Sequence, residues 1–416
     1  MNLDNPIRAQ RRSVLSRKAC SWLVVVLLGL AVYANITPTA ASDAAFTIAV
    51  LPDTQGYTAY DKPDARAAIF RQQTQWIAAN AVTENIVFVA QTGDIVNNGA
   101  TQPIEWQRAD AAMDLLDGVA PYSVATGNHD YNRVGSRSSG ASAYLSYFGP
   151  QRYARYAWYG GASSNKLNQY QVFQAGGWTF LHLALELEAP DSAIAWAQSV
   201  INANPGLPTI ISTHSYQDDK TGRTTKAQFQ GNSGEQIWSK LVRPNPQIFM
   251  VLNGHFYKED GERSQVSTNA AGLPVFEMVN DYQMYPNGGN GYMRLIRFDP
   301  ANKRIEVQSY SPYLNQFMTD SHSQFTFSVK LYERFAMSST LTAPPTNTVT
   351  PTSTPAPPST TPTLESQPPT PVATTSPPQP SPIPTTAPAA PEPTAALGTG
   401  KVGRSAVWLP LIFGNS

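Results

Sequence analysis

Residues 122–130 read YSVATGNHD, a short strand-like run that passes directly into Gly127-Asn128-His129-Asp130. A run of this kind, with little alternation of polar and apolar positions, is typical of a strand covered on both faces. Amide, imidazole and carboxylate side chains then follow in three successive positions. Polar groups at the carboxyl end of a strand mark the place where open α/β sheets bind ligands.

Four other strand-like runs end in the same way. They lead into Asp53-Thr54-Gln55, Gly93-Asp94, His214 and Gly254-His255-Phe256-Tyr257. A single Asp after a strand is usually a turn former or a helix cap, and a single His is usually a packing residue. Roles in turns, caps or packing do not readily explain five side chains able to bind a metal at the ends of five strands. These residues are Asp53, Asp94, Asn128, His214 and His255.

Strands and helices alternate before Gly272. The pattern predicts strands at 46–51, 86–90, 122–125, 179–185, 209–212 and 248–252, and helices at 65–80, 105–116, 192–202 and 235–241. After Gly272 it turns to strands alone, at 275–279, 292–298, 305–310 and 325–329. This order predicts an α/β fold of two packed mixed β-sheets flanked by helices.

The order and the sequence motifs of the five clusters resemble those of the calcineurin-like metallophosphoesterase family. The family pattern runs Asp-x-His, Gly-Asp, Gly-Asn-His-Asp/Glu, a lone His, and Gly-His-x-His. The match spans Ala45 to about Lys330, and residues 127–130 are its most specific motif. The resemblance implies a four-layer αββα sandwich. It also implies hydrolysis of a phosphate mono- or diester by a metal-bound hydroxide, since metal binding lowers the pKa of water.

The resemblance further implies roles for individual residues and a centre of two divalent metal ions. Asp94 would bridge the ions, Asn128, His214 and His255 would complete the second site, and Asp53 would bind in the first. His129 would stabilise the phosphoryl group or protonate the leaving oxygen, and Asp130 would orient its ring.

Two positions depart from the family pattern, and both belong to the first metal. Gln55 and Tyr257 stand where the family has histidine, and the resemblance is to a subgroup that has Asp-Thr-Gln in place of Asp-x-His. The amide oxygen of Gln55 is a ligand for a hard cation, whereas a neutral Tyr257 is a poor one. Exchange of imidazole for oxygen donors shifts preference from zinc toward manganese, magnesium, calcium or iron. Mn, Fe, Zn and Ca are therefore the candidate ions, and an empty first site is the alternative.

Several other polar residues have open interpretations. Asp281 and Gln283 follow the strand at 275–279 and would either approach the cleft, to replace a lost metal ligand or contact substrate, or form a loop with Gly turns, which is the commoner case for polar loop residues. The segment 217–233, with Lys220 and Arg223, either overhangs the site or is a solvated loop. The aromatic and basic segment 147–158 either caps the site or packs. His182 is expected in the core and His322 at the surface.

The two ends of the chain differ in composition from its middle. Residues 1–41 have a basic stretch, an apolar run from Trp22 to Ala34 and small residues at the end, which predicts an export signal of the ordinary secretory or the twin-arginine type. The globular domain is expected at 42–338. A Pro/Thr-rich disordered linker at 339–400 and an apolar tail at 401–416 follow. The tail either attaches the protein to a cell surface or docks on the domain.

The charge and the cysteine content argue against a nucleic-acid-binding surface and against cysteine ligands for a metal. The segment 1–41 holds five of the 29 basic and one of the 29 acidic residues, so the rest carries 24 basic and 28 acidic residues. A net charge of about −4 provides no basic stripe for nucleic acid. The one cysteine, Cys20, lies in the export signal, so any metal site uses oxygen and nitrogen ligands.

The sequence thus predicts a secreted or cell-surface phosphoesterase. Its partner would be a small-molecule phosphate ester, with no nucleic acid and no transmembrane segment once the signal is cleaved. The alternative is a catalytically weak or inactive surface module that binds a metal or ligand on the same fold, and the exchanged residues Gln55 and Tyr257 are its motivation.

Overall fold

The computed structural model describes residues 44–335 of the 416-residue chain. The predicted export signal at 1–41, the linker at 339–400 and the tail at 401–416 lie outside the described residues. Within 44–335, none of the helices combines the length and the apolar character needed to cross a bilayer.

One large sheet is built around the first strand of the domain. Its order is β15–β14–β13–β1–β2–β3, with β16 also pairing with β14. β1, β2 and β3 run parallel, while β13 and β14 add antiparallel strands on the other side. The strands are β1 (Phe46–Leu51), β2 (Ile86–Gln91), β3 (Tyr122–Val124), β13 (Met293–Asp299), β14 (Arg304–Ser311), β15 (Gln316–Phe317) and β16 (Gln324–Ser328).

The second large sheet has the order β11–β12–β10–β7–β6–β5–β4. Its central strands β12, β10, β7 and β6 are parallel, and antiparallel strands close both edges. The strands are β4 (Tyr159–Ala162), β5 (Gln169–Ala175), β6 (Trp178–Ala184), β7 (Thr209–Ser212), β10 (Ile248–Asn253), β11 (Glu262–Thr268) and β12 (Pro274–Asn280). A small hairpin of β8 (Gln217–Asp218) and β9 (Gly222–Arg223) follows β7.

Three hydrophobic cores separate four layers. Phe46, Ile48 and Val50 of β1 face a core shared with the second sheet, whereas Ala49 and Leu51 face the helices on the other side. This division follows from the alternation of side chains along a strand. A third core lies between the second sheet and its own helices. The described part of the chain is therefore a helix–sheet–sheet–helix sandwich.

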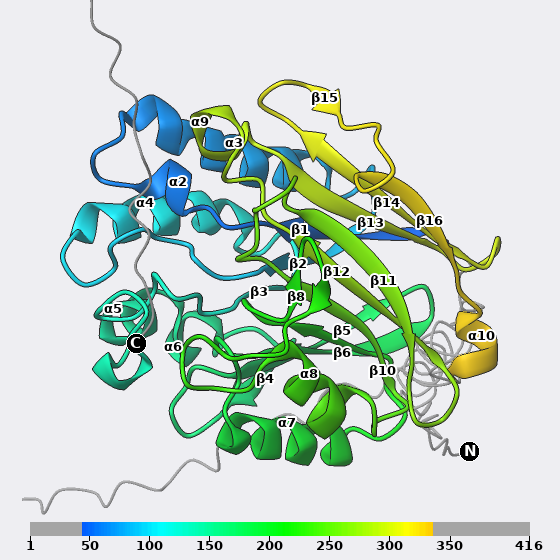
Figure 1. Cartoon of the computed structure of the whole chain (residues 1–416). Helices are drawn as coiled ribbons and strands as arrows, with labels where there is room; N and C mark the ends of the chain where they lie inside the picture. Colours follow the sequence, from blue (N-terminus) through cyan, green and yellow to red (C-terminus); the bar gives the residue numbers. More distant parts are fainter. Residues whose placement is uncertain (1–43, 336–416) are drawn as a thin grey trace, which may run out of the picture. The chain divides into compact units, whose positions relative to one another are not determined.

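The helices lie on the outer faces of the two sheets. α3 (Asp64–Asn80) and α4 (Pro103–Met113) cover the first sheet, and α7 (Asp191–Ala203) and α8 (Gly234–Ile237) cover the second (Figure 1). Shorter helical segments are α2 (Gln55–Thr58), η1 (Asp114–Leu116), η2 (Arg137–Ser139), α5 (Ser142–Phe148), α6 (Pro150–Tyr153), η3 (Trp238–Val242), α9 (Pro286–Gly289) and α10 (Leu331–Arg334).

The predicted fold class is confirmed: two large mixed sheets are packed together and flanked by helices. The parallel strands β1, β2 and β3 of one sheet and β7, β10 and β12 of the other all lead into polar residues. Because parallel strands end at the same edge of a sheet, the polar residues after them gather there.

Candidate functional site

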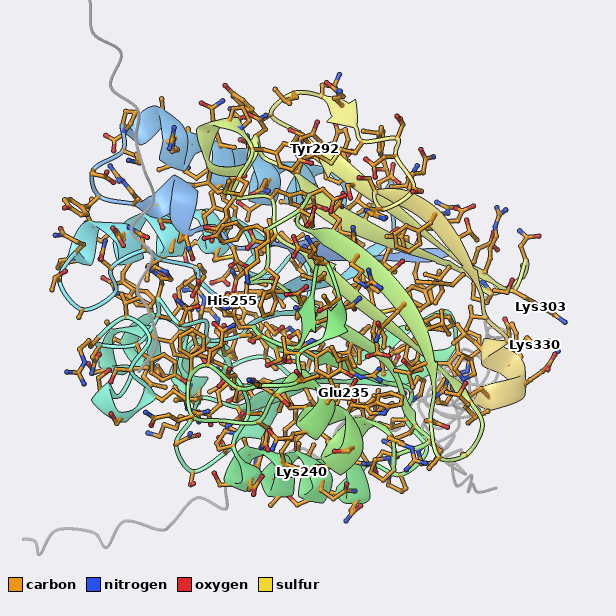
Figure 2. The ribbon with its side chains drawn as sticks, in the orientation of Figure 1. Glu235, Lys240, His255, Tyr292, Lys303 and Lys330 are labelled. Atoms are coloured by element: carbon orange, nitrogen blue, oxygen red, sulfur yellow. The ribbon has the colours of Figure 1, made fainter. Side chains whose placement is uncertain are left out.

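Four predicted site residues meet around one nitrogen atom. His214 Nε2 lies 3.1 Å from Asn128 Oδ1, 3.1 Å from His255 Nδ1 and 3.2 Å from Asp94 Oδ2. One ligand atom each from Asp94, His214 and His255 lies within 4.8 Å of the others. Figure 2 labels His255 near the middle of the domain. Oxygen and nitrogen donors converging in this way fit a transition-metal ion.

The ring of His214 is held in the orientation that a metal ligand needs. Its Nδ1 lies 3.0 Å from the carbonyl oxygen of Thr92, which can only accept, so Nδ1 carries the proton. Nε2 is then the basic nitrogen that faces the cluster. A second hydrogen bond of this type is the usual way in which proteins fix a ligating histidine.

Charge inside the cluster shifts the pKa values of its members. Burial lowers the pKa of His214, but the carboxylate of Asp94 outweighs it and raises that pKa above 6.5. Burial also opposes ionisation of Asp94, yet His214 brings the pKa of Asp94 down to about 2. Burial and the neighbouring His214 lower the pKa of His255 to about 3. Asp94 is thus ionised and His255 neutral at neutral pH.

Backbone conformation places Asp94 in the middle of the site. Asp94 has a left-handed φ of 51°, and its Oδ1 accepts a hydrogen bond of 2.8 Å from the amide of His129. A Cβ at Gly127 would lie 2.1 Å from that Oδ1 atom, and a Cβ at Gly254 would lie 2.0 Å from Asp53 Oδ1. Glycine is required at both positions because the carboxylates approach the backbone so closely.

The remaining first-site residues form a second group beside this cluster. Asp53 Oδ2 lies 3.9 Å from His214 Nε2, and the backbone amide of His255 donates to the Asp53 carboxylate at 3.2 Å. The side chain of Gln55 is 7% exposed, and its Oε1 has no hydrogen-bond partner among the described residues. A buried oxygen without a partner in this part of the chain, two residues along from a buried carboxylate, fits a cation better than a packed core.

Asp281 and Gln283 lie in the loop after β12 and join this second group, and Gln283 lines the cleft, as in the interpretation that brings them to the site. The Asp281 carboxyl group is 1% exposed and lies in hydrogen-bonding contact with that of Asp53. Burial, then Asp281 and Asp94, raise the pKa of Asp53 well above 3.8. Burial also raises the pKa of Asp281 to about 6. Gln283 contacts both Asp281 and Gln55.

Tyr257 lines the same cleft, but its side chain remains 37% exposed. Burial and the negative charge of Asp281 raise the pKa of the phenol above 10. Tyr257 is therefore neutral at physiological pH, and a neutral phenol is a weak metal ligand.

The predicted contact between Asp130 and the ring of His129 is replaced by other contacts. His129 Nδ1 lies 2.7 Å from the carbonyl oxygen of Asn97. Asp130 instead accepts hydrogen bonds from the backbone amides of Ile95, Val96 and Gly127. Burial and Asp94 raise its pKa to about 7. Asp130 thus holds together the two loops that carry Asp94 and Asn128, and Asn97 orients His129.

The site opens into a cleft of about 220 Å³. It is lined by Gln55, Asp94, Asn128, His129, Gln228, His255, Phe256, Tyr257, Lys258 and Gln283. Gln228 belongs to the segment 217–233, which therefore reaches the cleft. The expected cations of that segment point elsewhere, because Lys220 pairs with Glu259 and Arg223 pairs with the buried Glu277. Sequence reasoning missed Lys258, the cation in the cleft lining, although it follows the His255 cluster directly.

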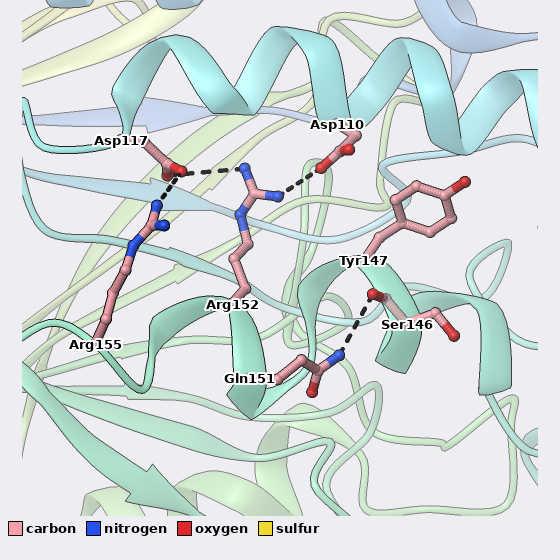
Figure 3. A pocket seen from close by; sticks show the side chains of 7 residues that line it. All are labelled: Asp110, Asp117, Ser146, Tyr147, Gln151, Arg152 and Arg155. Atoms are coloured by element: carbon pink, nitrogen blue, oxygen red, sulfur yellow. Dashed lines mark hydrogen bonds and ion pairs between the residues drawn. The ribbon is translucent and has the colours of Figure 1, made fainter. Parts of the chain in front are cut away.

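The aromatic and basic segment 147–158 packs rather than caps the site. Arg152 binds Asp110 at 2.5 Å, and Arg155 binds Asp117 at 2.8 Å (Figure 3). These residues line a different pocket, of about 380 Å³, whose arginines already have carboxylate partners. His182 is fully buried and bonds Gln171, and His322 is exposed and pairs with Asp260, as expected for both histidines.

Comparison with known proteins agrees with the geometry. The model of the calcineurin-like phosphoesterase family matches residues 46–259. The chain belongs to this family. It is 34% identical over 300 residues to the uncharacterized protein YvnB of Bacillus subtilis (strain 168), a match that covers 70% of this chain. The match covers 22% of YvnB, so this chain spans about a fifth of that relative.

Solved structures with a related fold include two phosphatases. Purple acid phosphatase PPD1 from yellow lupin (Lupinus luteus) seeds has a TM-score of 0.47 and 11% identity, over 71% of this chain and 56% of the lupin protein. A dimetal phosphatase from Danio rerio has a TM-score of 0.43 and 14% identity, over 68% of this chain and 98% of the fish protein.

Proposed function

We propose that this member of the calcineurin-like phosphoesterase family is an exported enzyme that hydrolyses a phosphate mono- or diester with two divalent metal ions. The observation that carries the proposal is the convergence of Asp94, Asn128, His214 and His255 beside His129 in one cleft. The proposed ligands of the metal ions are Asp53, Gln55, Asp94, Asn128, His214 and His255, with Asp94 shared between the two ions.

Bound metal ions would supply positive charge for the phosphoryl oxygens and a nucleophile derived from water. The protein fixes the donors before any ion arrives: Thr92 sets the tautomer of His214, and Gly127 allows the Asp94 carboxylate to reach the centre. Donors held in place lose little conformational entropy on binding, so more of the interaction energy remains for affinity.

His129 is the proposed proton donor to the leaving oxygen. The Asn97 carbonyl accepts a hydrogen bond from Nδ1, which directs the other ring nitrogen, Nε2, away from that contact. His129 lines the cleft, so Nε2 is available to a substrate oxygen there. Lys258 in the same lining would attract the negative charge of a phosphate ester.

The test is hydrolysis of a chromogenic phosphate monoester and a diester by the EDTA-treated full chain, with Mn²⁺, Fe²⁺, Zn²⁺ or Ca²⁺ added separately. Turnover with at least one ion is expected. In the variant His129→Ala, kcat falls by about 10²–10⁴-fold with unchanged metal content, as for loss of a general acid. Undiminished activity of this variant contradicts the role of His129.

The catalytically inactive binding module predicts a different outcome of the same assay. It binds one ion tightly and turns over neither ester with any of the four metals. Export and surface attachment depend on segments outside residues 44–335, and they remain predictions from the sequence. Fractionation of a producing cell, with the full chain detected in medium, envelope and cytoplasm, tests them.

A further inference from the structure

Three buried carboxylates in this region have a histidine, but no lysine or arginine among the described residues, to balance them. Asp53, Asp94 and Asp281 are each 1% exposed. His214 faces Asp94 at 3.2 Å and Asp53 at 3.9 Å. Within residues 44–335, no ion pair joins a lysine or arginine to any of these three aspartates. Buried carboxylates are normally paired or bound to a metal, because an unpaired one costs several kcal/mol.

A buried amide oxygen without a partner among residues 44–335 belongs to a residue that is hydrogen-bonded, through Gln283, to Asp281. Gln55 donates through Nε2 to Gln283 Oε1 at 3.0 Å, which leaves Gln55 Oε1 buried and without a partner in the described part of the chain. Gln283 in turn donates through Nε2 to Asp281 Oδ2 at 2.8 Å. Gln283 therefore fixes the position of Gln55 and Asp281 together, and orients the free oxygen of Gln55. A chain of hydrogen bonds thus joins Gln55 to Asp281, and the Asp53 carboxylate lies 3.9 Å from His214, the residue that also faces Asp94.

The backbone brings Asp281 to this position in a defined way. Its amide donates to the Gly261 carbonyl at 2.8 Å, and the next side chain, Tyr282, bonds the buried Glu262 at 2.6 Å. A Cβ on Gly261 would come within 1.8 Å of the Asp281 carbonyl oxygen, so the two segments are in direct backbone contact.

The loop after Asp281 also fits against the helix that carries Gln55. A Cβ on Gly56 would lie 3.0 Å from the Cα atom of Gly288, so the two backbones touch. The hydroxyl of Tyr57 accepts a hydrogen bond of 2.9 Å from the amide of Gly291. The segments 53–57 and 281–291 are thus interlocked, and their polar side chains meet on the side of the cleft.

We propose that Asp281 is a metal ligand, and that it forms with Asp53, Gln55 and Asp94 a first metal site made only of oxygen donors. Gln283 is a positioning residue that holds Asp281 and Gln55. The site takes a hard divalent cation, with Mn²⁺ as the probe, while the second site with its two imidazoles takes a transition metal. This inference rests on the proposed function in one respect, namely that the cleft binds cations.

The chemistry of the donors supports a hard ion. Carboxylate and amide oxygens suit Mg²⁺, Ca²⁺ and Mn²⁺, which accept six or more oxygen ligands including water, whereas zinc sites are usually tetrahedral and rich in nitrogen or sulfur. A carboxylate in place of a neutral imidazole also adds one negative charge. Three carboxylates then balance most of the charge of two divalent ions.

The test measures metal binding rather than turnover. The EDTA-treated full chain is titrated with Mn²⁺ by calorimetry, and free Mn²⁺ is followed by electron paramagnetic resonance. The unchanged protein is expected to bind two ions. Asp281→Asn is expected to weaken one site by at least tenfold and leave the other unchanged, and Gln283→Ala to weaken the same site less. The matched control is Asp299→Asn, a buried carboxylate outside the cleft, which should bind both ions normally.

The proposal is overturned if Asp281→Asn binds Mn²⁺ at both sites with the affinities of the unchanged protein. It is also overturned if a folded Asp281→Asn variant loses Mn²⁺ affinity equally at both sites. A second variant keeps the test decisive if Asp281→Asn does not fold. Gln55→His restores one imidazole to the first site and is expected to raise its Zn²⁺ affinity relative to Mn²⁺ at least tenfold; an unchanged ratio contradicts the oxygen-only site. Two bound ions without turnover would contradict only the proposed function, and turnover with unaltered binding in Asp281→Asn would contradict only this inference.

Discussion

Replacement of Asp53 by asparagine should stabilise the metal-free protein. In the absence of a metal ion, the Asp53 carboxylate faces that of Asp281 inside the domain. Two ionised carboxylates about 4 Å apart would repel by roughly 4 kcal/mol at an effective dielectric constant of 20, and protonation of one of them, which the raised pKa of Asp53 reflects, relieves this repulsion at a cost of the same order. The side-chain amide introduced by Asp53→Asn would instead donate a hydrogen bond to Asp281.

The stabilisation by Asp53→Asn is reduced because the amide oxygen of asparagine is a weaker hydrogen-bond acceptor than a carboxylate. The His255 backbone amide donates to the Asp53 carboxylate at 3.2–3.3 Å, a long hydrogen bond whose weakening costs about 1–2 kcal/mol. The net stabilisation is therefore about 2 kcal/mol. At an unfolding entropy of about 2.1 cal/mol/K per residue, this corresponds for residues 44–335 to a rise in melting temperature of about 3 °C.

Metal binding should reverse the order of stability. A ligand at 100 times its Kd stabilises the native state by about 2.7 kcal/mol, so saturating Mn²⁺ should raise the melting temperature of the unchanged protein by about 4 °C for each site. The variant Asp53→Asn should lose most of this gain. Thermal unfolding at pH 7.5 in EDTA and in Mn²⁺ measures both effects, and Asp299→Asn is the control whose metal response should not change.

Either half of the result can refute the reasoning. If Asp53→Asn melts below the unchanged protein in EDTA, the buried carboxylates are not an uncompensated charge. If it retains the full stabilisation by Mn²⁺, Asp53 is not a ligand. A protein that is more stable without its functional carboxylate would fit the general conflict between stability and an active site.

Three further predictions concern the shared carboxylate and the pH response. Asp94→Ala should abolish binding of both metal ions, and metal analysis showing two bound ions would refute the bridging role. Gly127→Ala should lower metal affinity by at least tenfold because its Cβ would lie 2.1 Å from Asp94 Oδ1; calorimetry that shows no change would contradict this geometry. Burial raises the pKa of Asp281 to about 6, above the usual 3.8. Between these values the folded metal-free state holds more protons than the unfolded state, so Asp281 makes stability fall as pH rises. A metal ion needs the ionised form, so the Mn²⁺-induced rise in melting temperature should grow from pH 5 to 7.5, and a flat response would count against Asp281 as a ligand.

The core strands were predictable because burial leaves a simple sequence signal. β1, β2, β7 and β10 are nearly continuous apolar runs, and their predicted and observed bounds agree within one residue. The edge-side strand β11, with the sequence ERSQVST, was not predicted because it is polar and only partly buried. β5 was also missed, although its alternation of buried and less buried positions carries a strand signal.

The site residues were predictable where a short sequence motif marks them. They were not predictable where the order of strands in the sheet determines their position. Asp53, Asp94, Asn128, His214 and His255 follow recognisable strands, and the structure brings all five together. Asp281 follows a strand in the same way, but its place depends on β12 lying parallel and next to β10. Neighbouring positions of that kind arise from tertiary pairing, which no local pattern encodes. The same limit explains the acceptor of His129, since Asn97 is far along the chain from it.

The exchanged residues Gln55 and Tyr257 are the motivation for the alternative of an inactive module. The structure gives them a context in which the carboxyl group of Asp281 lies beside Asp53 and the amide of Gln283 is hydrogen-bonded to Gln55 and Asp281. A protein that bound only one ion, through Asp94, Asn128, His214 and His255, would gain nothing from burying two more aspartates, whose mutual repulsion weakens the fold. Because this cost is unbalanced without a cation, the first group of residues is better explained as a rebuilt metal site than as a lost one.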